Sequence, residues 1–138
     1  MNAIDTNILA RFLMNDDDVQ AQKVHQLFKQ AEVQHTTLFI PMLVVIELIW
    51  VLESAYKIER TNILDAIHDL THMPTLTFEN LPALKNFIIT ARTSNFDLSD
   101  LLIAYSAQTQ GYDKVITFDK KASKFELFES VTHCLNQD

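Results

Sequence analysis

The sequence contains only one glycine, one cysteine and three prolines in 138 residues. A single glycine cannot build the glycine-rich loops that cradle phosphates, which excludes dinucleotide-binding and P-loop NTP chemistry. A single cysteine, Cys134, can form neither an internal disulfide nor a cysteine-rich zinc site. Because cysteines are this scarce, we expect a protein of the reducing cytoplasm.

Long apolar runs are also missing from the chain. No run reaches the ~18–20 residues that a membrane-spanning helix needs. The N-terminus lacks the basic segment and following apolar stretch of a signal peptide. At roughly 100–200 residues per domain, the length predicts one domain over residues 1–138. We therefore expect a cytoplasmic, single-domain protein with no membrane partner.

Basic side chains are scarce: 11 Lys and Arg stand against 18 Asp and Glu, for a net charge of −7. Affinity for nucleic acids comes largely from Lys and Arg that displace counterions from phosphates, so the chain alone suits a polyanion poorly. Divalent cations held by carboxylates would reverse the local potential and contact phosphate oxygens directly. The placement of the acids therefore decides which substrates the protein can bind.

Short β-favouring segments alternate with segments of helical periodicity. Strands are expected at residues 1–5, 37–41, 75–78 and 114–118. Helices are expected near residues 8–13, 19–33, 42–56, 61–72, 82–91, 99–110 and 120–128. This alternation implies right-handed crossovers between parallel strands. The predicted fold class is a three-layer α/β domain with a mainly parallel central sheet flanked by helices.

Two acids directly follow predicted strands: Asp5 follows the first and Asp119 the last. Ligands of open parallel sheets bind beyond the carboxyl ends of the strands, so both side chains are expected at that edge. Taken singly, an aspartate after a strand is also typical of an ordinary turn or helix cap.

A third acid, Glu47, interrupts the otherwise apolar segment 38–52. A helix that is apolar on all sides is normally buried. An ionised glutamate in such a helix is costly unless a cation or hydrogen bonds compensate for the lost hydration. We therefore expect Glu47 to have a functional role; the alternative is that its side of the helix reaches water.

Asp97 and Asp100 are three residues apart at the start of a predicted helix, where they share one face and the helix dipole favours negative charge. Asp100 directly precedes the apolar run 101–104, which places it at the rim of the core, whereas Asp97 is better placed to cap the helix. Oxygen ligands with room for water suit Mg²⁺ or Mn²⁺. The chemistry natural to such a site is phosphodiester hydrolysis.

A competing metal signal is the pair His68 and His72, four residues apart on a predicted helix as in zincins. Asp69 stands where the zincin motif has glutamate, no third ligand is evident, and Pro74 ends the helix. We therefore interpret the pair as two surface histidines.

Four segments, in this order and at these separations, resemble the PIN-domain ribonucleases, and in particular the toxins of VapBC-type toxin–antitoxin pairs. The segments are 5–11 (DTNILAR), 45–52 (VIELIWVL), 96–104 (FDLSDLLIA) and 117–121 (TFDKK). The resemblance covers nearly the whole chain. It implies a metal-dependent endoribonuclease that acts on RNA, forms a homodimer and is inhibited by a small antitoxin protein.

The resemblance also implies the site residues. The positions that match the family's four acids, expected to be catalytic and to hold Mg²⁺ or Mn²⁺, are Asp5, Glu47, Asp100 and Asp119. The neighbouring matches, expected to support the acids or contact RNA, are Asp97, Thr6, Asn7, Thr117 and Arg11.

Other classes fit the sequence less well. A phosphoaspartyl phosphatase needs Asp-x-Asp after the first strand, and Asn7 occupies the second of these positions. A response-regulator receiver needs paired acids there. A catalytically silent PIN-like interaction module is the remaining alternative, and metal-dependent RNA cleavage that a chelator stops would distinguish the two.

Overall fold

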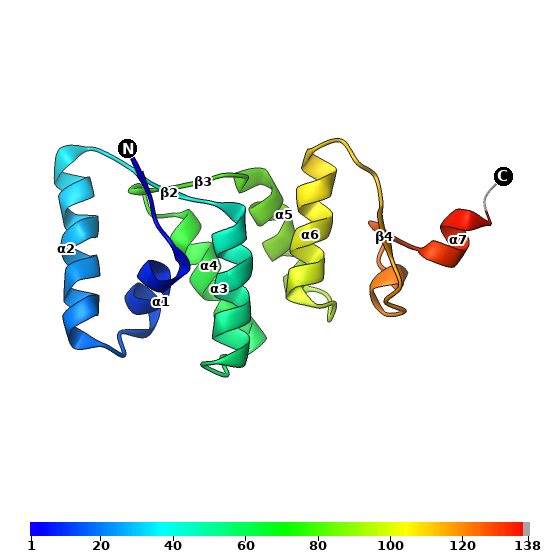
Figure 1. Cartoon of the computed structure of the whole chain (residues 1–138), viewed down its shortest axis with the longest axis horizontal. Coiled ribbons are helices and arrows are strands. Elements are labelled where there is room, and N and C mark those ends of the chain that lie inside the picture. Colours follow the sequence, from blue (N-terminus) through cyan, green and yellow to red (C-terminus); the bar gives the residue numbers. More distant parts are fainter. Residues whose placement is uncertain (137–138) are drawn as a thin grey trace. The chain divides into compact units, whose positions relative to one another are not determined.

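The computed structural model describes residues 1–136 as alternating helices and short strands (Figure 1). The chain divides into two compact units, Met1–Glu79 and a second that begins at Asn80. None of the helices in the described range is both long and apolar enough to cross a membrane.

The first unit has a three-stranded sheet in the order β1-β2-β3, with both pairings parallel. Its elements are β1 (Asn2–Ala3), α1 (Thr6–Met14), α2 (Asp18–Gln34), β2 (Leu38–Ile40), α3 (Met42–Ser54), α4 (Arg60–Thr71) and β3 (Leu76–Phe78). The central strand alternates buried and exposed residues, since Leu38 and Ile40 are buried and Phe39 is not. The sheet thus contributes to the core through one face of β2.

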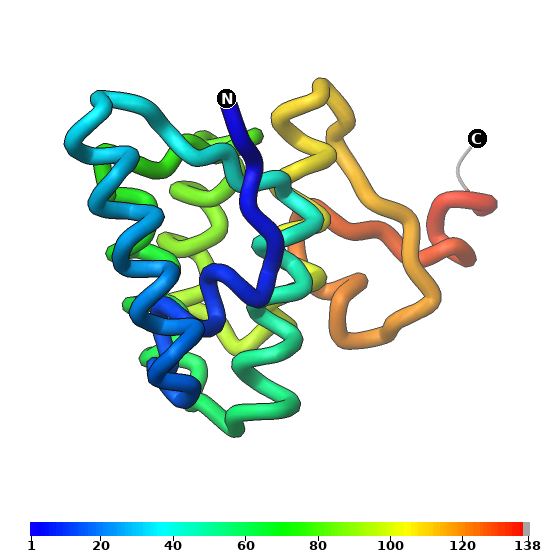
Figure 2. The backbone as a smooth tube through the Cα atoms, turned by 60° about the vertical axis from the view of Figure 1, so that its left-hand side comes forward, coloured from blue at the N-terminus to red at the C-terminus, as the bar shows by residue number. Residues whose placement is uncertain are grey.

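The helices of this unit bury apolar stripes against one another. Helix α1 packs on both α2 and α3, and α1 and α2 lie side by side in Figures 1 and 2. The most deeply buried helical side chains of the unit include Leu9, Leu48, Ile49, Leu52, Ile63, Leu64 and Ile67. These residues recur at helical spacing, which fixes the face that each helix turns inward.

Local hydrogen bonds define where these helices begin. The carboxylate of Asp17 accepts a hydrogen bond from the Gln20 N–H at 3.0 Å and caps α2. Helix α3 follows Pro41, which cannot cap with its side chain; instead the Glu79 carboxylate accepts from the Met42 N–H at 3.2 Å. The end of β3 thereby satisfies a free N–H at the start of α3.

The second unit combines a helix pair with a parallel two-stranded sheet. Its elements are α5 (Leu81–Arg92), α6 (Leu98–Thr109), β4 (Val115–Thr117), a 3₁₀ helix η1 (Ala122–Lys124), β5 (Phe128–Ser130) and α7 (Val131–Leu135). Helices α5 and α6 pack together, and α5 carries the fully buried Phe87. Asn80 caps α5 through the Ala83 N–H and also donates to the Thr109 hydroxyl at the end of α6.

The predicted pattern of helices and parallel strands is confirmed for most of the chain. Gly111 lies just after the end of α6, where the sequence predicts a C-terminal cap. Its φ of +93° is a left-handed conformation that glycine adopts without strain. The prediction of a helix over residues 120–128 is wrong. Only η1 is helical there, because Phe128 pairs with Val115 and is buried at the start of β5.

Candidate active site

Asp5 lies exposed at the junction between β1 and α1. Its carboxylate caps α1 by accepting a hydrogen bond from the Ile8 N–H at 3.3 Å. Both neighbours are buried: Ile4 is 7% exposed, and Thr6 is 5% exposed. The junction is therefore anchored in the core while the carboxylate of Asp5 faces solvent.

An open cavity of about 420 Å³ lies beside Asp5, between α1 and α2. Three of the predicted site residues, Asp5, Asn7 and Arg11, line its α1 side. Lys23 lines the α2 side, above an apolar floor that includes Val24. The cavity offers a carboxylate, an amide and two cations within one unit.

Arg11 is held in a polar network within the first unit. Its guanidinium donates to the Gln20 side chain at 2.6 Å, to the Asp16 carboxylate at 3.1 Å and to the Tyr56 hydroxyl at 3.1 Å. The Tyr56 hydroxyl donates to the other oxygen of Asp16 at 2.8 Å. The hydrogen bond with Tyr56 is the main cause that raises the pKa of Arg11 and lowers the pKa of Asp16.

This network gives Arg11 an acidic partner, one of the two roles that the sequence leaves open for it. It joins α1, the start of α2 and the loop after α3. Sequence reasoning missed Tyr56 and Gln20, because Tyr56 is 45 residues from Arg11 along the chain. No periodicity signals a contact at that separation.

Glu47 lies on the exposed side of α3. Leu43 and Trp50, which flank it on the same face, are 79% and 63% exposed. The expectation that the apolar helix buries Glu47 is therefore wrong. One face of α3, which includes Leu48 and Ile49, is buried in the core. The other face carries Glu47 beside apolar side chains that are also exposed.

Asp97 and Asp100 occupy the first turn of α6 in different ways. Asp97 is the N-cap, and its carboxylate accepts from the Asp100 N–H at 3.0 Å, as the sequence predicts. Asp100 is half-buried next to the fully buried Leu101. Burial raises the pKa of Asp100, and the negative charges of Asp97 and Asp119 raise it further. Ionised Asp100 is thus destabilised by its surroundings.

Asp119 follows β4, and its carboxylate accepts from the Ala122 N–H at 2.8 Å at the start of η1. Its own backbone N–H donates to the Thr117 hydroxyl at 3.0 Å, which gives Thr117 a direct role in shaping this turn. Lys121 donates to the Asn95 carbonyl at 2.8 Å and so ties the turn to the loop before α6. Sequence reasoning assigned no role to Lys121.

The second unit therefore brings the carboxylates of Asp97, Asp100 and Asp119 within electrostatic range of one another, while the first unit carries Asp5 and Glu47. Within either unit, as far as residue 136, no three His, Cys, Asp or Glu side chains are grouped closely enough to hold a metal ion. The donors are all oxygens, and a cation would relieve the repulsion at Asp100. This donor chemistry fits Mg²⁺ or Mn²⁺.

Comparison with known proteins decides the family. The sequence profile of the PIN domain matches residues 3–126. The chain belongs to the PIN domain family. It is also similar to a protein named VapC ribonuclease from Aquifex aeolicus (strain VF5), with 26% identity over 124 residues that cover 90% of this chain and 91% of the relative.

The PIN match includes residues of both units and every predicted site residue from Asp5 to Asp119. It confirms the resemblance inferred from the four segments and, together with the parallel strand pairings, the predicted α/β class.

Proposed function

We propose that this PIN-domain protein is a metal-dependent endoribonuclease that acts as the toxin of a type II toxin–antitoxin pair. The observation that carries the proposal is the PIN match across residues 3–126, a range that includes Asp5, Glu47, Asp100 and Asp119. The similarity to a VapC ribonuclease supports RNA as the substrate. The mutual repulsion of carboxylates around Asp100 supports a divalent cation there.

In the proposed site, Asp5 and Asp100 hold the principal Mg²⁺ or Mn²⁺, and Glu47 and Asp119 ligate through water or orient the attacking water. The bound cation supplies an activated water and neutralises phosphate charge during an in-line displacement. The protein's own contribution is to fix the carboxylates. Asp5 and Asp119 accept hydrogen bonds from backbone N–H groups, and the backbone of Asp100 is anchored by the burial of the next residue, Leu101.

The surrounding residues support these carboxylates. Asp97 shapes the first turn of α6, and the Thr117 hydroxyl accepts the N–H of Asp119. We assign Arg11 to the α1–α2 connection rather than to RNA, because its guanidinium is already engaged by Asp16, Gln20 and Tyr56. Thr6 and Asn7 flank Asp5, where Thr6 packs inward and Asn7 lines the neighbouring cavity.

We further propose that residues 1–138 form one catalytic domain, that two copies form a homodimer in the cytoplasm, and that a small antitoxin protein inhibits the enzyme. An antitoxin segment with an arginine facing the carboxylates would replace the cation by a charge-assisted ion pair. Co-expression with the protein encoded by the adjacent reading frame tests this partnership.

The deciding experiment compares wild type with Asp5→Asn in an RNA-cleavage assay with Mg²⁺ or Mn²⁺. Asparagine caps helices as well as aspartate does, so α1 should remain intact while the charge is lost. The control Asp113→Asn makes the same chemical change at an exposed loop position outside the proposed site. We expect cleavage by wild type and by the control, cessation with chelator, and none by Asp5→Asn.

Expression in cells gives the parallel test of the toxin assignment. Wild type and Asp113→Asn should arrest growth, and Asp5→Asn should not. Metal-independent cleavage, or a folded Asp5→Asn variant that cuts RNA at the wild-type rate, would contradict the proposed site. A complete lack of cleavage by wild type would instead favour the catalytically silent module.

A further inference from the structure

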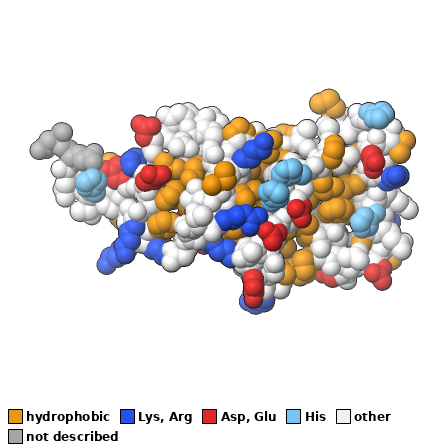
Figure 3. All heavy atoms as spheres, turned by 180° about the vertical axis from the view of Figure 1, so that it is seen from behind, with side chains coloured by type: hydrophobic (Ala, Val, Ile, Leu, Met, Phe, Trp, Pro, Cys, Tyr) orange, Lys and Arg blue, Asp and Glu red, His pale blue; other side chains and the backbone are white. Residues whose placement is uncertain are grey.

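The exposed side of α4 carries a pair of histidines that the proposed nuclease function does not use. His68 lies in the last turn of α4, and His72 immediately follows the helix. Their ring centroids are 4.4 Å apart, with an angle of 38° between the planes. Figure 3 shows the molecule from behind, with several histidine side chains at its surface. Both residues of the pair are exposed and accessible to a ligand.

Hydrogen bonds fix the tautomer of His72. Its Nδ1 lies 2.9 Å from the His68 carbonyl oxygen, which can only accept, so Nδ1 carries the proton. The Thr71 hydroxyl donates to the same carbonyl at 2.6 Å, which leaves its oxygen, 3.3 Å from Nδ1, as a second acceptor. The lone pair of neutral His72 is therefore on Nε2.

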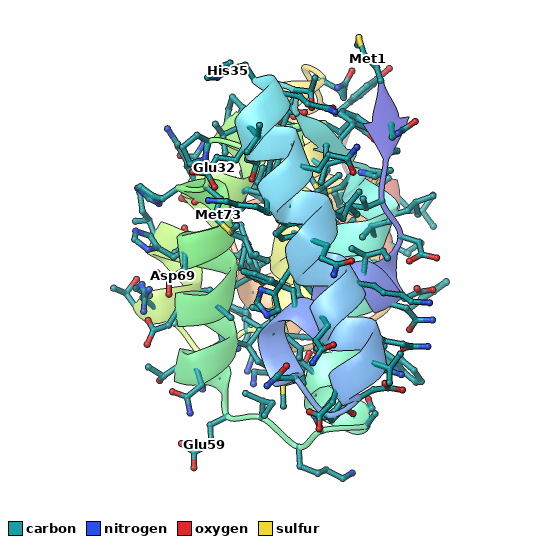
Figure 4. All side chains as sticks on the ribbon, turned by 90° about the vertical axis from the view of Figure 1, so that its left-hand side faces the viewer. Met1, Glu32, His35, Glu59, Asp69 and Met73 are labelled. Carbon is teal, nitrogen blue, oxygen red and sulfur yellow. The ribbon has the colours of Figure 1, made fainter. Side chains whose placement is uncertain are left out.

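His68 has an acidic neighbour at ion-pair distance rather than a hydrogen bond. Its Nδ1 lies 3.5 Å from a carboxylate oxygen of Asp69, which favours the proton on Nδ1 and the lone pair on Nε2. The Asp69 side chain is 82% exposed and projects from α4 into solvent (Figure 4). Metal-binding histidines almost always donate their second ring N–H to a carbonyl or carboxylate, and each member of this pair faces such an acceptor.

We propose that His68 and His72 form a two-imidazole site for a divalent transition metal of the Zn²⁺, Ni²⁺ or Cu²⁺ class. His72 is the C-cap residue of α4, one turn after His68, and the contact between the two rings places them side by side. Imidazole nitrogen favours these ions, whereas Mg²⁺ prefers oxygen. Water completes the coordination, since no third His, Cys, Asp or Glu joins the pair among residues 1–136. The site is a surface chelate, not the hydrolytic centre of a zincin.

The test is calorimetric titration of the full chain with Zn²⁺ in the presence of millimolar Mg²⁺, which keeps carboxylate sites occupied. Wild type is compared with His68→Gln and His72→Gln, which remove one imidazole each. The control is His133→Gln, because His133 adjoins Cys134 and lies 3.6 Å from Glu129, which makes it the competing location for Zn²⁺. We expect either α4 variant to bind Zn²⁺ at least about tenfold more weakly, and the control to match wild type.

A measurement on wild type alone keeps the test independent of how the variants fold. In wild type, ¹⁵N NMR should show Zn²⁺ shifting the Nε2 resonances of His68 and His72.

Wild-type Zn²⁺ affinity in both α4 variants, or loss of binding in His133→Gln alone, would overturn the proposal, as would unshifted Nε2 resonances. Mg²⁺-dependent RNA cleavage should be unchanged in His68→Gln. The proposed histidine site and the proposed ribonuclease activity are therefore tested independently of each other.

Discussion

Replacing Asp100 by asparagine should stabilise the metal-free protein and, if the proposed site is correct, remove its binding of the divalent cation. In the folded state the Asp100 carboxylate is half-buried and lies near the charges of Asp97 and Asp119, which together raise its pKa. A raised pKa means that the folded state disfavours the ionised form. Asparagine has nearly the same shape without the charge, so the repulsion disappears.

The expected gain in stability of Asp100→Asn follows from the distance between the charges at the start of α6. Side chains three apart on a helix have Cβ atoms ~5–6 Å apart, at which two unit charges in water repel by about 0.8 kcal/mol. The high-dielectric limit is the appropriate one because the half-buried Asp100 still contacts solvent, and salt reduces the repulsion further. With a smaller contribution from Asp119, we expect about 0.5–1 kcal/mol, or a rise in Tm of about 2–5 °C for a chain of this size.

The assay is thermal unfolding of the metal-free protein at low salt, followed by circular dichroism. As pH rises through the raised pKa of Asp100, wild type loses stability, because its folded state holds that proton more tightly than the unfolded state does. Below the unfolded-state pKa the carboxyl is protonated in both states, so the advantage of Asp100→Asn should vanish near pH 3. The control Asp113→Asn should show no comparable gain.

Two results of the thermal unfolding assay would contradict this reasoning. A lower Tm for Asp100→Asn at neutral pH would mean that its charge stabilises the fold. A gain that persists at pH 3 would mean that the effect is not electrostatic.

Three further outcomes are expected. Millimolar Mg²⁺ should raise the Tm of wild type but not of Asp100→Asn. The reason is that a ligand that binds only the folded state adds RT ln(1 + [L]/Kd) to the free energy of unfolding. A wild-type Tm that neither Mg²⁺ nor Mn²⁺ changes would contradict the proposed metal site. Asp97→Asn should keep the cap of α6, and calorimetry should show that it still binds Mn²⁺. Its RNA-cleavage rate should fall about 10–100-fold, the usual effect of replacing a residue that supports a metal ligand. Phe87→Ala should cost about 3–5 kcal/mol in chemical denaturation, because the Phe87 side chain on α5 is fully buried. A cost below about 1 kcal/mol would contradict that burial.

Local signals were sufficient to predict most elements of the fold. The cap at Asn80 and the turn at Gly111 depend on short-range chemistry that a single sequence displays. The segment 120–128 was predicted incorrectly because its structure depends on a distant partner. Phe128 becomes part of a strand by pairing with Val115, and this tertiary contact overrides helical periodicity.

The candidate site was predictable to a similar extent. The capping role of Asp97 and the position of Asp100 at the rim of the core follow from the neighbouring apolar run, and the structure has both. The exposure of Glu47 was not predictable, because an apolar sequence does not reveal which sides of α3 meet other elements. The tie between Lys121 and Asn95 joins two loops and leaves no periodic signature.

The capping bonds of Asp5 and Asp119 also restrict how these carboxylates bind a cation. In each side chain Oδ1 accepts a backbone N–H, from Ile8 and from Ala122 respectively. Oδ2 carries no such bond, so an ion bound through Oδ2 alone would leave each cap undisturbed, whereas an ion bound through both oxygens would compete with the capping N–H for Oδ1. Ca²⁺ often takes carboxylates in the two-oxygen mode, whereas Mg²⁺ accepts a few single oxygens and retains water at the other positions. The same bonds that start α1 and η1 would thus favour an ion that takes one oxygen from each of these carboxylates.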